Sequence, residues 1–131
     1  MEVATQSTYP TSNSDELLAK LRQKFGDRIV AEQSTCDGIP TLWIDRQHLI
    51  TLLRALRDDI QPKFEMLFDI TAIDERLRVH RSDQPPSEFT VVYHLMSFSG
   101  NCDIRIKVPL IDADLNLPSI IGLWPAVNWY E

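Results

Sequence analysis

The sequence has few of the residues that build cofactor and disulfide sites. Its 131 residues include two cysteines, four glycines and three histidines. Two cysteines are too few for a secreted disulfide framework, a four-ligand zinc site or an iron-sulfur cluster, so we expect Cys36 and Cys102 to be reduced thiols. The glycines, at positions 26, 38, 100 and 122, are too far apart for a phosphate-binding loop. A nucleotide site built on such a loop is therefore excluded.

The chain also lacks a surplus of positive charge and a long apolar run. Its 13 basic and 19 acidic residues give a formal net charge of -6, whereas nucleic-acid binding requires Lys and Arg to hold phosphates. No segment reaches the roughly 18 apolar residues that span a bilayer, and the start does not resemble a signal peptide. We expect protein partners, no nucleic acid and no direct membrane insertion.

What remains is the composition of an ordinary globular domain, with 44% hydrophobic and 24% charged residues. Residues 1–13 are rich in Ser, Thr, Gln and Asn, which predicts a disordered polar tail. We expect residues 14–131 to form a single domain. Asn128 and Glu131 have the spacing of a capping box, so the domain is expected to be truncated at its C-terminal end.

The first half of the domain predicts two helices and three strands. Leucines at helical spacing predict a helix over residues 14–25, with Asn13 and Glu16 as its capping box. Strands at 29–32 and 41–44 should form a hairpin, and Asp45 can cap a second helix. Residues 64–73 are apolar on both sides, which predicts a strand in the middle of a sheet.

The second half predicts a hairpin of residues 89–98 and 102–110. Asp103, Arg105 and Lys107 alternate with apolar residues in its second strand, so one face of the sheet should be polar. Pro118 can begin a short helix that ends at Leu123. The predicted order is α-β-β-α-β-β-β-α. It favours an α+β two-layer sandwich, a mixed β-sheet of about five strands with two amphipathic helices on one face.

Few residues are candidates for chemistry. No two histidines have metal-ligand spacing, so no metal site is predicted. Asp69 or Asp74 with His94 could form an acid/base pair, but ion pairs of these acids with neighbouring arginines are the stronger interpretation. Trp124, Trp129 and Tyr130 crowd the carboxyl end, as aromatic residues do in a core or a protein interface.

Several segments resemble one family. They are Met66-Leu67-Phe68-Asp69-Ile70, Asp74-Glu75-Arg76-Leu77-Arg78 with His80-Arg81, Tyr93-His94-Leu95, Asp103-Ile104 to Lys107-Val108, and Pro118 to Glu131 with its Asn128-Trp129-Tyr130-Glu131 ending. Together they resemble the N-terminal segment of the C subunit of bacterial NADH:quinone oxidoreductase, respiratory complex I. The residues from Asp74 to Arg81 look most like the form in which the C and D subunits are fused.

The resemblance implies a non-catalytic scaffold in the peripheral arm of a proton-translocating enzyme that transfers electrons from NADH to quinone. It implies no catalytic, cofactor-binding or metal-binding residues in this segment, with flavin, iron-sulfur clusters and the quinone (ubiquinone) site elsewhere in the complex. The implied partners are the other hydrophilic-arm subunits and the D portion if fused. The implied location is the cytoplasmic side of the bacterial inner membrane, as a peripheral protein held there by the complex.

Two alternatives remain from the residues alone. One is a free-standing adaptor domain that binds proteins, and the other is a small acid/base enzyme using Asp69, Asp74 and His94.

The polar face and the aromatic end are the candidate interface, formed by Arg105, Lys107, Trp129, Tyr130 and Glu131. We expect Arg105 and Lys107 to be exposed, so reversing both to Glu should leave the domain folded, with a change of less than about 0.5 kcal/mol in the free energy of unfolding. The same change should impair assembly with partners, which native electrophoresis of the complex would measure. Normal assembly would place the interface elsewhere, and loss of folding would show that the two charges are not exposed.

Overall fold

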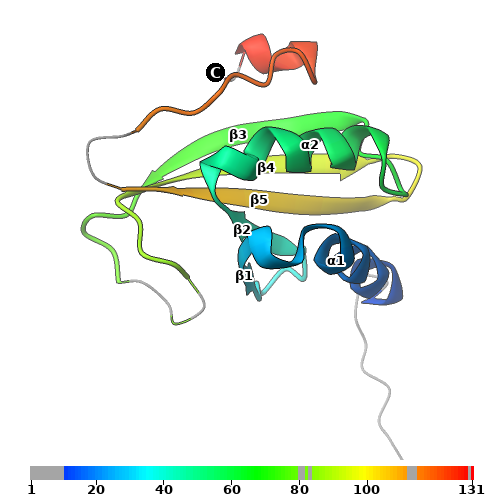
Figure 1. Cartoon of the computed structure of the whole chain (residues 1–131), viewed down its shortest axis with the longest axis horizontal. Helices are drawn as coiled ribbons and strands as arrows, with labels where there is room; N and C mark the ends of the chain where they lie inside the picture. Colours follow the sequence, from blue (N-terminus) through cyan, green and yellow to red (C-terminus); the bar gives the residue numbers. More distant parts are fainter. Residues whose placement is uncertain (1–10, 80–81, 83, 112–114, 130) are drawn as a thin grey trace, which may run out of the picture.

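The computed structural model describes residues 11–79, 82, 84–111, 115–129 and 131. Its sheet has the strand order β1-β2-β5-β4-β3, and Figure 1 shows how the helices are arranged around it. The strands are β1 (Ile29–Gln33), β2 (Thr41–Ile44), β3 (Met66–Asp74), β4 (Phe89–Ser97) and β5 (Cys102–Leu110). The helices are α1 (Thr11–Phe25) and α2 (Leu49–Asp58), with short 3-10 helices η1 (Gly26–Arg28), η2 (Arg46–His48) and η3 (Pro125–Trp129). The predicted α+β class and element order are confirmed.

The sheet is mixed because one of its four pairings is parallel. β2 pairs with β5 in parallel, whereas β1 with β2, β3 with β4, and β4 with β5 are antiparallel. The long connection from β2 to β5 contains α2 and the β3–β4 hairpin, which gives the chain enough length to return in the same direction. β5 is therefore the strand that joins the two hairpins.

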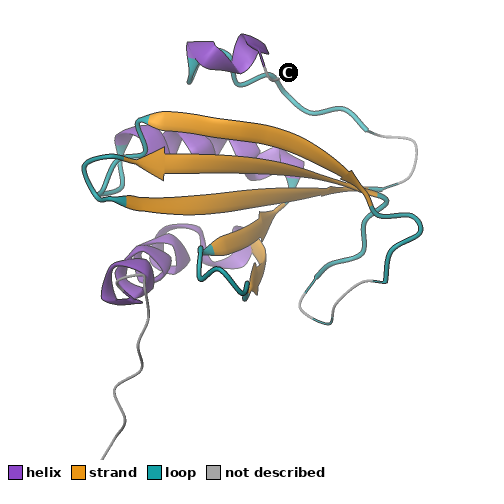
Figure 2. Ribbon diagram, turned by 180° about the vertical axis from the view of Figure 1, so that it is seen from behind, coloured by secondary structure: helices purple, strands orange, loops and turns teal. Residues whose placement is uncertain are grey.

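The hydrophobic core lies between the helices and one face of the sheet, which Figure 2 shows with α2 behind it. In α1, Leu17, Leu21 and Phe25 recur every four residues and are at most 2% exposed, so they form one apolar stripe. α2 adds Leu49, Leu52, Leu53, Ala55 and Leu56. From β5, Ile104, Ile106 and Val108 enter the same core.

Both helices begin differently from the prediction. α1 begins at Thr11, so Asn13 lies within the first turn of the helix and not at the cap position. The rest of the predicted tail, residues 1–10, lies outside the described residues. Asp45 makes no side-chain capping bond, since η2 precedes α2 and the His48 N–H donates to the Asp45 carbonyl at 3.0 Å.

The predicted central position of the strand at 64–73 is wrong, because β3 lies at the edge of the sheet. Leu67 is buried, but Met66 is 37% and Phe68 49% exposed. Phe64, which contributed to the apolar pattern, is buried ahead of the strand. A register shift between Leu67 and Asp69 further interrupts the alternation. In this strand, apolar residues on both sides thus belong to a bulged edge strand and not to a buried central strand.

The predicted helix from Pro118 to Leu123 is also wrong. This stretch is irregular, and the last helix is η3, which Pro125 begins, as suits a residue that lacks an N–H. The segment is held to the core by buried Ile120, Leu123, Trp124 and Val127. Asn128 lies within η3, and the carboxylate of Glu131 accepts hydrogen bonds from the Ser119 hydroxyl at 2.7 Å and the Ile120 N–H at 2.9 Å. The predicted capping box is therefore wrong, and Glu131 instead holds residues 119 and 120 in place.

The β4–β5 turn gives a test of the fold. A Cβ added at Gly100 would overlap Cγ and Cβ of Pro62, so Gly100→Ala should force the turn and the Pro62 loop apart. We expect a loss of about 1–3 kcal/mol in the free energy of unfolding, measured by urea denaturation. Gly26→Ala is the control, because nothing lies within 4 Å of its added Cβ. Equal stability of the two variants would contradict this packing.

Candidate functional site

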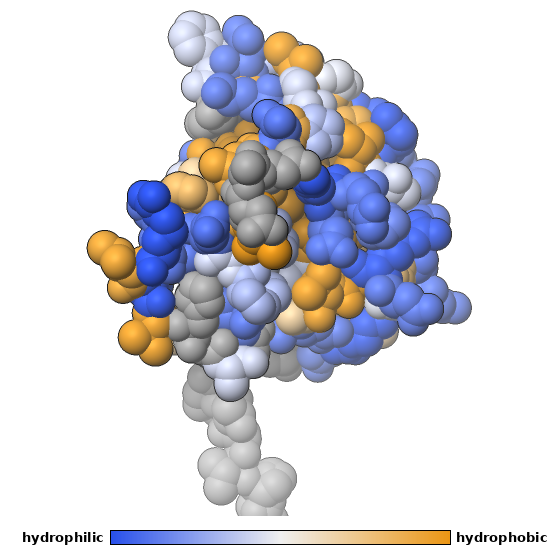
Figure 3. Space-filling view, turned by 60° about the vertical axis from the view of Figure 1, so that its left-hand side comes forward, coloured by the Kyte–Doolittle hydropathy of each residue, from blue (hydrophilic) through white to orange (hydrophobic). Residues whose placement is uncertain are grey.

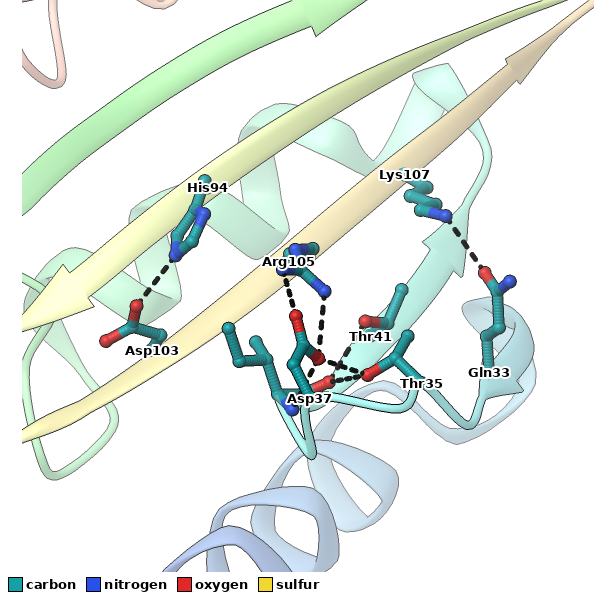
Figure 4. Close-up of polar contacts among 9 residues, drawn as sticks. Gln33, Thr35, Asp37, Thr41, His94, Asp103, Arg105 and Lys107 are labelled. Atoms are coloured by element: carbon teal, nitrogen blue, oxygen red, sulfur yellow. Dashed lines mark hydrogen bonds and ion pairs between the residues drawn. The ribbon is translucent and has the colours of Figure 1, made fainter. Parts of the chain in front are cut away.

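The sheet face opposite the core carries the polar side chains, and we call it the open face. It is defined by His94 of β4 and by Asp103, Arg105 and Lys107 of β5, which Figure 4 shows on one side of the two strands. The intervening Ile104, Ile106 and Val108 are all 0% exposed. The predicted alternation of polar and apolar residues in β5 is confirmed.

Arg105 holds the turn between β1 and β2. Its guanidinium donates to both carboxylate oxygens of Asp37, at 3.2 and 2.5 Å. Asp37 also accepts from the Thr35 hydroxyl at 2.6 Å and the Ile39 N–H at 3.1 Å. These hydrogen bonds hold the pKa of Asp37 well below its usual value of 3.8, and the bond from Arg105 has the largest effect. The carboxylate therefore stays ionised and fastens the turn to β5.

Lys107 covers the aromatic side chain of β2. Its ammonium lies 5.3 Å from the centroid of the Trp43 ring, within cation–π range, and donates to Oε1 of Gln33 at 3.1 Å. The same oxygen accepts from the Trp43 indole N–H at 2.9 Å. Trp43 is 0% exposed although it pairs with Lys107 on the open face. Lys107 and Gln33 thus form part of the cover that keeps this indole from water.

The expectation that Arg105 and Lys107 are free exposed charges is therefore wrong. Sequence alternation identifies the face on which a residue lies, but it does not reveal partners that come from a distant hairpin. Reversing both residues to Glu would place a second carboxylate beside Asp37 and remove the cation over Trp43, so that variant should lose stability as well as any contact with partners.

His94 is placed between two acidic residues. Its Nε2 lies 2.8 Å from Oδ2 of Asp103, and Asp69 is its cross-strand neighbour on β3. Phe68 packs against the imidazole, with 5.2 Å between the ring centroids.

Asp74 does not join the proposed acid/base group. It pairs with Phe89 at the other end of β3, and hydrogen bonds from the Arg76 side chain and N–H lower its pKa to about 2. The structure thus brings together Asp69 and His94 but not Asp74. A cleft of about 210 Å³ is lined by residues 45–47 and 109–111, and two others lie beside α1; none of these three is lined by Asp69, Asp74 or His94.

A buried carboxylate anchors the loop between β3 and β4. Its burial was not predicted from the sequence. Glu75 is 3% exposed and accepts from the Thr90 hydroxyl at 2.6 Å and the Gln84 amide at 3.0 Å. Arg78 lies 3.5 Å from its other oxygen. Arg76 and Arg78 of this loop are thus paired with Asp74 and Glu75. His80 and Arg81 lie outside the described residues.

This loop carries the most exposed apolar side chains among the described residues. Leu77 is 100% and Val79 95% exposed. Figure 3 shows hydrophobic groups standing out among hydrophilic ones on the side of the molecule that carries the loop.

The aromatic carboxyl end divides between core and surface. Trp124 is 5% exposed and packs in the core, whereas Trp129 is 88% exposed. Glu131 is occupied by Ser119 and Ile120, and Tyr130 lies outside the described residues. Of the candidate interface, Trp129 is thus the described residue with the most accessible side chain.

Metal-ligand clusters and membrane-spanning helices are both absent from the described ranges. No group of three or more His, Cys, Asp or Glu side chains there could hold a metal ion, and Cys36 and Cys102 are both free thiols. None of the described helices is long and apolar enough to cross a membrane.

Comparison with known proteins gives consistent matches. The family described as respiratory-chain NADH dehydrogenase, 30 Kd subunit, matches residues 42–131. An NADH-quinone oxidoreductase C/D subunit from Chromohalobacter salexigens is 50% identical over 117 residues, 89% of this chain and 20% of the relative. The protein of the same name from Acidiphilium cryptum is 46% identical over 126 residues, 95% of this chain and 21% of the relative. This chain spans about a fifth of the length of these curated relatives.

The Asp37–Arg105 pair predicts how stability depends on pH. Because the folded pKa of Asp37 lies below 3.8, the pair contributes stability above that value and loses it as pH falls toward the depressed pKa. Asp37→Asn should therefore reduce stability at pH 7 and flatten the decline below about pH 4, which thermal unfolding at several pH values would measure. Asp27→Asn, at an exposed acid with no ion pair to another described residue, is the control. If the stability of Asp37→Asn falls below pH 4 as steeply as that of the wild type, the role given to this pair is contradicted.

Proposed function

Because the chain belongs to the family of the respiratory-chain NADH dehydrogenase 30 Kd subunit, we propose that it is a scaffold segment of proton-translocating NADH:quinone oxidoreductase. In this role the domain stabilises the peripheral arm and supports electron transfer from NADH to quinone. It contributes no catalytic residue and binds no flavin, iron-sulfur cluster, quinone or metal ion, which are held elsewhere in the complex.

The family match over residues 42–131 carries this proposal. It spans the joining strand β5, the β3–β4 hairpin and the carboxyl-terminal segment. The chemistry of the open face supports a structural role, because the polar side chains that define it contact other residues of the fold. Arg105 engages Asp37 and His94 engages Asp103. Removing one partner of such a pair would leave the other charge without compensation, which makes these residues structural.

The names of the relatives support the choice of partners. They are called C/D subunits, and we propose that this domain likewise continues into a D portion. It would contact the other hydrophilic-arm subunits on the cytoplasmic side of the bacterial inner membrane and reach the membrane only through them. Trp129, 88% exposed, is the side chain that we propose contacts one of these neighbours, since exposed tryptophan is typical of protein interfaces.

Two tryptophans five residues apart test this proposal. In the full-length protein, Trp129→Ala should leave the domain folded, within about 0.5 kcal/mol, but reduce copurification with the arm subunits. Trp124→Ala is the matched control for a core residue and should cost about 3–5 kcal/mol by leaving a cavity. Absence of the wild-type protein from the purified arm would overturn the proposed function. Normal copurification of Trp129→Ala would remove only Trp129 from the interface.

A further inference from the structure

The open face carries an apolar patch away from its charge pairs. We define the β3–β4 patch as Met66 and Phe68 of β3 with His94 and Met96 of β4. Met66 pairs with Met96 across the two strands, and Phe68 packs on the His94 ring. Met66 is 37% and Phe68 49% exposed. Large apolar side chains that lie close together on an edge strand and remain partly exposed to water are typical of an interaction site.

Acidic residues lie around the patch. Asp69 follows Phe68, Asp103 lies beside His94, and Glu65 precedes Met66. Within the described residues, neither Glu65 nor Asp69 forms an ion pair with Lys or Arg. The backbone N–H of Phe98 donates to the Glu65 carboxylate at 2.8 Å, which lowers the pKa of Glu65 and keeps it ionised. Glu65 and Asp69 therefore give the apolar patch a rim of negative charge that no ion pair with Lys or Arg compensates within the described residues.

We propose that the β3–β4 patch docks a segment of a protein partner in which apolar side chains are flanked by Lys or Arg. Such a segment would place its apolar groups on Phe68 and the two methionines, whose flexible thioethers adapt to the shape of a partner. Its basic groups would meet Glu65 and Asp69, which gives direction and specificity to the contact. The inference rests on the proposed function, because the partner would be another subunit of the same assembly.

The acidic rim argues against the other possible occupants. Anionic lipid headgroups and nucleic-acid phosphates would both be repelled by Glu65 and Asp69. A second copy of this chain related by a two-fold axis would bring like-charged rims together. The exposed Leu77 and Val79 specify no partner of their own, because the adjacent Arg76 and Arg78 are paired with Asp74 and Glu75.

Two substitutions in the full-length protein test the patch, with assembly into the arm measured by copurification and native electrophoresis. Phe68→Ser removes the apolar anchor, and Asp69→Lys reverses the rim without changing the apolar groups. Each should lower the assembled fraction at limiting protein by about tenfold, equivalent to about 1.4 kcal/mol. Leu77→Ser is the control for an exposed apolar residue and Asp27→Lys for an exposed acid. Both controls should assemble like the wild type.

The outcomes separate this inference from the proposed function. If the wild type assembles and both Phe68→Ser and Asp69→Lys assemble equally well, the patch is not a docking site. The scaffold role would remain intact. Failure of the wild type to assemble would overturn both. If the purified wild type self-associates and Phe68→Ser abolishes this, the patch binds a second copy of the chain. That result would overturn the proposal of a partner segment flanked by Lys or Arg. If thermal unfolding shows Phe68→Ser to be destabilised, Asp69→Lys decides alone.

Discussion

The parallel pairing of β2 with β5 is the contact on which the rest of the structure depends. It joins the β1–β2 hairpin to the β3–β4–β5 sheet through the pairs Thr41 with Arg105, Leu42 with Ile106 and Trp43 with Lys107. Leu42 and Ile106 secure it from the core side. Three register pairs are a short junction, so side chains on the open face reinforce it through the Arg105–Asp37 ion pair and the Lys107–Trp43 contact.

This junction determines which parts of the open face remain available to a partner. The cations of β5 are used inside the fold, so they stabilise the domain and do not present free charge. Met66 and Phe68 of β3 stay partly exposed, and the neighbouring Glu65 and Asp69 form no ion pair with Lys or Arg within the described residues. Trp129 is likewise accessible at the carboxyl-terminal segment. A scaffold built in this way can keep its shape with one set of residues and contact its neighbours with another.

Most of the elements could be predicted from the sequence because their signals are local. Leucine spacing identified α1 and α2, and alternation in residues 103–108 identified the core side of β5. Strand order is not local, and β3 was misplaced because Phe64 and the bulge at Phe68 imitate a strand buried on both faces. The partners of Arg105 and Lys107 come from the β1–β2 hairpin more than sixty residues away along the chain. Only the parallel pairing, which no local pattern encodes, brings them together.

Hydrogen–deuterium exchange of the full-length protein, alone and in the assembled arm, would separate the structural residues from the docking residues. We expect the amides of β2 and β5 to be protected already in the free protein, because their junction is internal to the domain. New protection on assembly should appear in β3 around Met66 to Thr71 and near Trp129. No gain of protection in these segments on assembly, or new protection confined to the turn at Asp37 and to β5, would contradict this division of the open face.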